Sequence, residues 1–217
     1  MIIILKKNLS SYSELRLKAE RIRALKPEVV PEPKQTISEE VTPKVILPSP
    51  SGVTPPMPLV GDLIQTGGRV GVLSKDILID LDIAGDNIKQ IFGIRHYIID
   101  HWHYIHDPEV DKDTWRSADV TIQLCHKGKF PGDCDDFAIL MASLAKQIGL
   151  NSRVVGGYSH GSGHAFAEFL SPRNYSFNSL VLDEAYSDSE GLWISLDWFS
   201  GKDHNDYNNN RDVILKD

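Results

Sequence analysis

The feature that most constrains the fold is a change of hydrophobic period near residue 150. Up to Gly149, apolar residues recur at helical spacing, as in the segment DCDDFAILMASLAKQIGL. From Ser152 onward, short runs of β-type residues are separated by Gly, Ser, Asn and Pro. Helices followed by strands are typical of the α+β class, in which helices pack on an antiparallel sheet. We therefore expect an α+β fold for this part of the chain.

The pattern also predicts where the individual elements lie. Helices are expected over residues 87–105, 114–124 and 134–149, and strands over residues 152–158, 164–170, 179–186 and 192–198. Asp86 is expected to cap the first of these helices, and the third begins at Cys134 or one residue earlier. A segment of mixed character, residues 69–83, precedes them.

The first 66 residues differ in texture from the rest. Ser11 and Glu14 fit a capping box, and the helix that they begin ends at Pro27. Its apolar stripe consists of Leu15, Ala19, Ile22 and Leu25. Nine of the twelve prolines then fall between Pro27 and Pro58, which predicts an extended linker. We expect residues 1–66 to be an appended helix and linker, and residues 67–217 to be the domain. The helix either packs on that domain or docks a protein partner.

Charge and composition exclude several classes of protein. The net charge is −7, and residues 1–60 carry nine Lys/Arg and six Glu (+3), which leaves −10 for residues 61–217. An acidic domain is not expected to bind nucleic acid. The apolar run MIIIL is too short to span a membrane, and Lys6 and Lys7 follow it, which is the reverse of a secretory signal. With only two cysteines and no disulfide framework, a cytoplasmic setting is expected.

Cys134 stands at the expected start of a long helix, after a Pro-Gly turn and among three aspartates. A helix N-terminus lowers the pKa of a thiol through its free N–H groups and the positive end of its dipole. Asp133, Asp135 and Asp136 suit that position for the same reason, yet their charges oppose a thiolate. An activated Cys134 therefore needs a histidine with which it forms a thiolate–imidazolium pair.

His164 is the histidine that best fits this role. It lies in GSGHAFAEF, where a Gly/Ser turn leads into a strand, so its ring would be held rigidly on one face with Phe166 and Glu168. His160 lies within the turn itself, where nothing fixes its ring. The neighbouring strand WISLDW supplies Asp197, a carboxylate in an apolar run that is costly to bury without a partner. Asp197 is therefore the expected acid that orients His164.

Three separated motifs, GDCDDFAILMASLAKQIGLNSRVVGGY, GHAFAEF and LWISLDW, resemble the transglutaminase-like (papain-like) superfamily, of bacterial or phage type. The upstream segment HYIIDHWHYIHDPEVDKDTWRSADVTIQ resembles the two helices that precede the family's cysteine. The resemblance covers about residues 87–198 and implies a papain-like transglutaminase-core fold. It implies Cys134 as nucleophile, His164 as general base and then acid, and Asp197 as the residue that orients His164. Many members have Trp where this chain has Phe166.

Acyl transfer also needs hydrogen-bond donors for the oxyanion. The backbone N–H of Cys134 is one such donor. Trp115 and Gln123 lie upstream of it, and each carries a side-chain N–H, so they are the candidates for a second donor. The alternatives are a buried structural tryptophan and a glutamine on a helix surface.

Metal binding is the weaker interpretation of two other clusters. Four residues with ligand atoms would share one helix face: His96, Asp100, His103 and Asp107. A solvated polar face explains them more simply, because zinc would need a further segment to complete its shell. Cys125, His126 and Cys134 match no common zinc-finger spacing and lack a second ligand pair. No cofactor or metal is expected.

These observations predict a cysteine-dependent amide hydrolase or acyltransferase, a protease or transamidase that acts on a protein or peptide through an acyl-enzyme. The alternative is a catalytically inactive transglutaminase-like scaffold whose N-terminal arm contacts a protein partner. A narrower hypothesis is a virion-associated or secretion-associated hydrolase, because transglutaminase-like domains with GDCDD-type motifs also resemble those carried by phages.

Overall fold

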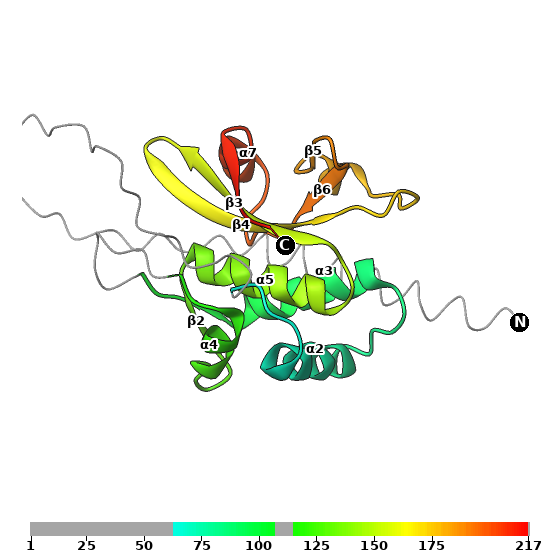
Figure 1. The fold of residues 1–217 in the computed structure, drawn as a ribbon, viewed down its shortest axis with the longest axis vertical. Helices are drawn as coiled ribbons and strands as arrows, with labels where there is room; N and C mark the ends of the chain where they lie inside the picture. The colour runs from blue at the N-terminus through cyan, green and yellow to red at the C-terminus, as the bar shows by residue number, and fades with distance from the viewer. Residues whose placement is uncertain (1–62, 107–114, 217) are drawn as a thin grey trace, which may run out of the picture. The chain divides into compact units, whose positions relative to one another are not determined.

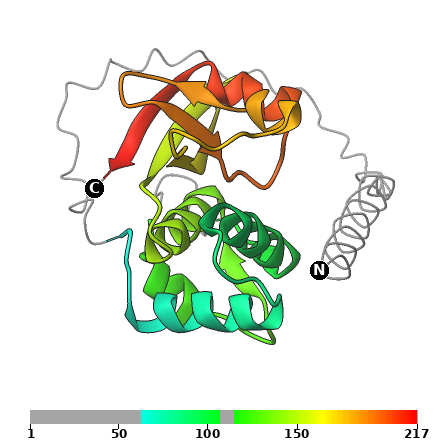
Figure 2. The same ribbon diagram turned by 90° about the vertical axis from the view of Figure 1, so that its right-hand side faces the viewer.

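The computed structural model describes residues 63–106 and 115–216. The helix and the proline-rich linker expected within residues 1–58 lie outside the described residues, and the proposed boundary at residue 67 stays a prediction. In the described part, a group of helices packs against one face of an antiparallel sheet (Figures 1 and 2). The expected α+β class is thereby confirmed. No helix among the described residues is long and apolar enough to cross a membrane.

The helices and strands have the following bounds. The helices are α2 (Gly68–Asp80), α3 (Asn87–Asp100), α4 (Ala118–Gln123), α5 (Cys134–Gln147), α6 (Ser179–Leu182) and α7 (Lys202–Asn208). The strands are β1 (Trp102–Tyr104), β2 (Phe130–Gly132), β3 (Ser152–Ser159), β4 (Ser162–Leu170), β5 (Tyr186–Ser187), β6 (Leu192–Ser195) and β7 (Arg211–Lys216). The main sheet has the order β5-β6-β4-β3-β7, and β1 pairs with β2 in a separate parallel pair.

Helix α5 is the centre of the hydrophobic core. Eleven of its fourteen residues are buried, because its broad apolar face meets the sheet on one side and α2 and α3 on the other (Figure 1). Leu63 and Ile64, the first described residues, are buried in the same core. The first residue of this central helix is Cys134, so the core holds the helix start in place.

Strand β4 shows the alternation expected of a strand in a two-sided sheet. Ala165, Ala167 and Phe169 belong to the core on the α5 side. His164 and Phe166 lie on the other face, where they contact Tyr207 and His204 of α7 (ring centroids 5.1 and 4.9 Å apart). The sheet therefore lies between α5 and α7.

Two expected elements differ in the structure. The helix expected to reach Ile105 ends at Asp100, because residues 102–104 extend to form β1 and pair with β2. The strand expected over residues 179–186 was wrong for its first half: residues 179–182 form α6, and only Tyr186 enters a strand. Asn178 explains this start, since its side chain accepts a hydrogen bond from the Val181 N–H (3.1 Å) as a helix N-cap.

Other segments are shorter than expected or were not predicted. Within the expected helix 114–124, the structure has α4 over 118–123, and Thr114 lies outside the described residues. The mixed segment 69–83 is mostly helix α2, and α7 and β7 follow the last predicted strand. Helix α7 has mostly polar residues without a helical stripe, so its sequence alone resembles a loop.

Candidate active site

Cys134 is placed by the strand that precedes it and by the helix that it begins. Gly132 at the end of β2 pairs with Tyr104 of β1, and the Gly132 carbonyl accepts a hydrogen bond from the Ile105 N–H (2.9 Å). Asp133 is the N-cap in extended conformation, and its side chain makes no capping hydrogen bond. Cys134 is half-buried at the first position of α5, as the sequence predicts.

Asp136, in the first turn of α5, is paired with Arg116. It is fully buried, and Arg116 donates hydrogen bonds to both of its carboxylate oxygens, with Nε 3.0 Å from Oδ1. Burial raises the pKa of Asp136 to about 6, and the hydrogen bonds and charge of Arg116 oppose that rise. One of the three aspartates around Cys134 is therefore a structural partner for Arg116.

His164 and Asp197 form a buried hydrogen-bonded pair. Nε2 of His164 lies 2.9 Å from Oδ2 of Asp197, and the two side chains are 6% and 1% exposed. Burial alone would raise the pKa of Asp197, but the hydrogen bonds that its carboxylate accepts from His164 and His204 lower the pKa below its usual value. Because an ionised carboxylate only accepts hydrogen bonds, Nε2 of His164 carries the hydrogen. Nδ1 is then the ring nitrogen that can take up a proton.

Asp197 lies just after β6 and is held by its backbone as well as by its side chain. Its N–H donates to Oγ of Ser195 (3.1 Å), and its carbonyl accepts from Nε of Arg95 on α3 (2.7 Å). Its second carboxylate oxygen, Oδ1, accepts the backbone N–H of Trp198 (2.7 Å). These contacts leave the carboxylate little freedom to turn away from His164.

His204 is a further partner of Asp197 that sequence reasoning missed. Its Nδ1 lies 3.0 Å from the same Oδ2 that meets His164, and the His204 ring is fully buried. The segment around it, KDHNDYNNN, is polar and has no hydrophobic period, so nothing in the sequence indicates that this histidine is buried.

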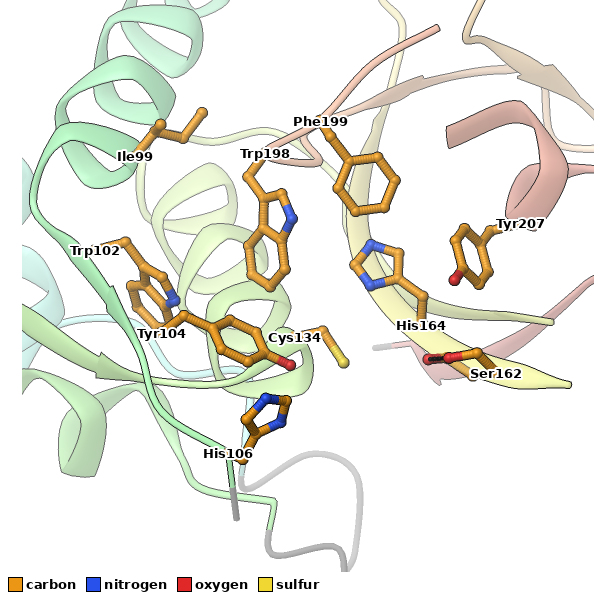
Figure 3. A pocket seen from close by; sticks show the side chains of 11 residues that line it. Ile99, Trp102, Tyr104, His106, Cys134, Ser162, His164, Trp198, Phe199 and Tyr207 are labelled. Atoms are coloured by element: carbon orange, nitrogen blue, oxygen red, sulfur yellow. Dashed lines mark hydrogen bonds between the residues drawn. The ribbon is translucent and has the colours of Figure 1, made fainter. Parts of the chain in front are cut away.

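Cys134 and His164 line the same open cavity, which has a volume of about 630 Å³. Figure 3 shows the Cys134 sulfur and the His164 ring facing this space from α5 and from β4. Aromatic side chains form most of the remaining wall: Trp102, Tyr104, Trp198, Phe199 and Tyr207. The His164 ring stacks on Phe199 (4.6 Å between centroids), and Trp198 contacts both His164 and Phe137 of α5. The aromatic wall therefore joins the helix side to the sheet side.

The two predicted oxyanion donors do not line this cavity. Trp115 is half-buried and packs against the core, and Gln123 is exposed at the last position of α4. Two other N–H carriers do line it, Trp102 and His106. The indole N–H of Trp102 is buried and has no hydrogen-bond acceptor in the described part of the chain. Both residues lie in the aromatic and histidine-rich segment HWHYIH, and this composition was the feature of the sequence that could have indicated them as donors.

Among the described residues, one group of carboxylates converges enough to hold a metal ion. Oxygens of Asp133, Asp135 and Asp136 lie within 4.8 Å of one another. The helix face considered in the sequence is interrupted, because His103 lies in β1 beyond the end of α3. Asp107, the last member of that face, lies outside the described residues.

A family profile of the transglutaminase-like superfamily matches residues 81–198. No curated protein matches the chain. Similar solved structures include a "putative cysteine protease" from Cytophaga hutchinsonii, with 18% identity and a TM-score of 0.39 over 72% of this chain and 51% of that chain. A "putative protease" from Parabacteroides distasonis has 15% identity and a TM-score of 0.41 (65% and 29% covered). Legionella pneumophila LapG has 19% identity and a TM-score of 0.38, over 58% of this chain and 86% of that chain. The chain thus spans about half or less of the first two proteins.

Proposed function

Because the chain belongs to the transglutaminase-like superfamily, we propose that it is a cysteine-dependent amide hydrolase or acyltransferase that works through an acyl-enzyme. One observation carries this proposal: Cys134 at a helix N-terminus and the hydrogen-bonded pair of His164 and Asp197 face one cavity. A nucleophile, a base and a group that orients the base are the three parts that covalent acyl transfer requires.

In the acylation half-reaction, the Cys134 thiol gives its proton to Nδ1 of His164, the nitrogen that does not face Asp197. The thiolate then attacks the amide carbonyl carbon of the substrate, which forms a C–S bond and moves charge onto the carbonyl oxygen. The backbone N–H groups at the start of α5 point toward that developing charge. Transfer of the proton from His164 to the leaving amine breaks the C–N bond and leaves a thioester on Cys134.

In the deacylation half-reaction, His164 takes a proton from water or from an acceptor amine as that molecule attacks the thioester carbonyl. The C–S bond breaks, and the proton returns to the Cys134 sulfur, so the thiol is regenerated. Asp197 stays ionised throughout and stabilises the imidazolium that forms twice in the cycle. Hydrolysis and transfer differ only in which nucleophile enters the cavity at this step.

The cavity supports a protein or peptide amide as the substrate. It is open to solvent and walled mostly by flat aromatic side chains from three different parts of the chain, among them Tyr104, Trp198 and Tyr207. Aromatic walls offer a peptide large apolar contact area and a low local dielectric, which strengthens the thiolate–imidazolium attraction.

The pH dependence of Cys134 alkylation tests the proposed function. Iodoacetamide labelling is followed by mass spectrometry, with the half-buried Cys125 as the internal reference. Because an ion pair with His164 keeps the thiolate populated in acid, we expect Cys134 to label rapidly well below neutral pH. The His164→Ala variant is expected to lose this acid labelling, whereas His160→Ala, which changes an exposed histidine at the β3–β4 turn, is expected to keep it.

The opposite result favours the inactive scaffold. If Cys134 in the wild-type protein labels only near the ordinary thiol pKa of about 8.5, there is no ion pair and the proposed function is wrong. Where the ion pair is found, turnover of a peptide mixture with and without added amine separates hydrolysis from transfer by the mass of the products.

A further inference from the structure

The carboxylate of Asp197 has two imidazole partners, although acyl transfer requires only one. Oδ2 lies 2.9 Å from Nε2 of His164 and 3.0 Å from Nδ1 of His204. His204 is fully buried and does not line the cavity that holds Cys134. It is therefore placed to act on the reaction through Asp197 rather than through the substrate.

The hydrogen bonds assign the hydrogen on His204. An ionised carboxylate accepts only, so Nδ1 of His204 donates to Asp197. Nε2 of His204 is buried and has no partner among the described residues. A doubly protonated ring would leave a buried N–H unpaired and would bury a charge, which costs more than an unpaired lone pair. His204 consequently suits the neutral form with its hydrogen on Nδ1.

A neutral second donor fixes Asp197 without cancelling its charge. The Trp198 N–H holds Oδ1 (2.7 Å), and His204 holds Oδ2, so the carboxylate is fixed at both oxygens. The full negative charge then remains to stabilise an imidazolium at His164. A cationic residue in place of His204 would compete with His164 for that charge.

Helix α7 holds His204 and the His164 ring together. Tyr207 lies one helical turn after His204 and contacts the His164 ring (5.1 Å), while His204 itself packs on Phe166 (4.9 Å). Glu184 fixes both ends of α7, because its side chain accepts the Gly201 N–H (2.7 Å) and its carbonyl accepts from Asn208 (3.4 Å).

Two arginines also lie near this centre. Arg95 on α3 donates to the Asp197 carbonyl (2.7 Å), and Arg211 on β7 reaches Asn208 of α7 (2.6 Å) and also pairs with Glu168 of β4. In these contacts, neither arginine donates to the carboxylate of Asp197. The two imidazole rings and the Trp198 N–H are its hydrogen-bond donors in the described part of the chain.

We propose that His204 is a positioning residue of this centre, which holds the Asp197 carboxylate in the orientation that stabilises a protonated His164. This inference rests on the proposed function for its effect on Cys134. The arrangement of His204, Asp197 and His164 can be tested whether or not the proposed function is correct.

A matched pair of variants separates the hydrogen bond from the shape of the side chain. His204→Asn keeps an N–H close to the position of Nδ1, and His204→Leu has the same branching of side-chain heavy atoms as the Asn variant but no donor. We expect alkylation of Cys134, measured at a pH on the acid limb of the wild-type profile, to be about tenfold slower in His204→Leu, because a looser Asp197 moves that limb up by about one pH unit. His204→Asn is expected to stay within about twofold of wild type. Equal rates in the two variants would overturn the proposal.

Nuclear magnetic resonance of the ring nitrogens gives a readout that does not depend on catalysis. The His164 Nε2–H is expected to be protected from solvent exchange in the wild type and in His204→Asn, and to lose that protection in His204→Leu. If wild-type Cys134 labels as an ordinary thiol, the proposed function fails and this resonance alone decides the inference. A His164 Nε2–H that is equally protected in all three proteins would contradict it.

A third variant covers the case in which His204→Leu does not fold. His204→Gln keeps a polar amide but places its N–H near the position of Nε2. It therefore does not replace the Nδ1 hydrogen that faces Asp197. It is expected to behave like the Leu variant in both measurements, with circular dichroism as the check on folding. Wild-type behaviour of His204→Gln would show that the Nδ1 hydrogen bond is not what positions Asp197.

Discussion

At the scale of single residues, the start of α5 depends on a close approach that only glycine permits. A Cβ atom added to Gly132 would lie 2.6 Å from the Cβ of Asp136, well inside van der Waals contact. Asp136 cannot give way easily, because it is buried and paired with Arg116. The glycine before Asp133-Cys134 is therefore required by packing, beyond its ability to turn the chain.

Gly132→Ala is expected to destabilise the protein by about 1–3 kcal/mol, the usual cost of overpacking a buried site. It should also slow the alkylation of Cys134, because Asp136 and the first turn of α5 must shift. Gly71→Ala is the matched control: its Cβ would meet Gln147 at an ordinary 3.6 Å, inside helix α2. Alanine favours a helix interior, so that variant should be as stable as wild type or more stable. Chemical denaturation measures the free energy of unfolding of both variants. Equal stabilities would refute the packing argument.

At the scale of elements, ion pairs fix the turn between β5 and β6 to β3. Arg153 of β3 donates to Asp188 (2.7 Å) and to Glu168, and its guanidinium lies 3.7 Å from the centre of the Trp193 ring. The Trp193 indole N–H also donates to Asp188 (3.1 Å). This network holds in place the edge of the sheet from which β6 leads to Asp197.

The pKa of Asp188 gives a prediction for acid unfolding. Although desolvation acts to raise it, the hydrogen bonds from Arg153, from the Glu190 N–H and from Trp193 lower the pKa to about 2. Because this folded-state value lies below the unfolded one, the stabilisation is present above about pH 4 and is lost as the pH falls toward 2. The Asp188→Asn variant is expected to be about 1 kcal/mol less stable than wild type at neutral pH, a figure that allows for solvent screening.

The difference in stability between wild type and Asp188→Asn should shrink as the pH falls from 4 to 2. Urea unfolding at a series of pH values measures it, and Asp76→Asn, a change at an exposed carboxylate of α2, is the control. A difference that stays constant through this range would exclude the ionised Asp188 as its source.

At the scale of the whole molecule, burial is concentrated in α5 and the strands that cover it. Eleven of the fourteen α5 residues are buried, whereas α6 has none. Regions with few buried contacts open locally, while the centre of a core exchanges its amide hydrogens only when the whole domain unfolds. Cys134 therefore stands at the first position of a largely buried helix, which is expected to be the most stable element of the fold.

Amide hydrogen exchange tests this distribution of stability. Peptides from the middle of α5 are expected to exchange at least about a hundredfold more slowly than peptides from α6. Peptides that span the start of α5 should show the same slow exchange once past the first turn, whose N–H groups have no partners within the helix. Similar rates in α5 and α6 would mean that α5 does not form the stable centre of the fold.

The predicted elements differ in how well local pattern determined them. The start of α5 and the alternation of β4 follow from the spacing of neighbouring residues, and the structure agrees at Cys134 and at His164. Residues 179–182 contain β-type side chains but form α6, because the Asn178 side chain caps the start of a helix there and outweighs their propensity. The end of α3 at Asp100 depends on pairing of β1 with β2, almost thirty residues later.

The sequence by itself determined the α+β class, the helix that begins at Cys134 and the strand that carries His164, because periodicity and capping act between residues a few positions apart. Only the tertiary structure decided that Arg116 would pair with Asp136, that His204 would share Asp197 with His164, and which aromatic side chains would wall the cavity. These contacts join separate elements, and they depend on how α5, the sheet and α7 pack together. Long-range packing leaves no period in the sequence, which is the physical reason why these parts of the site had to be seen in three dimensions.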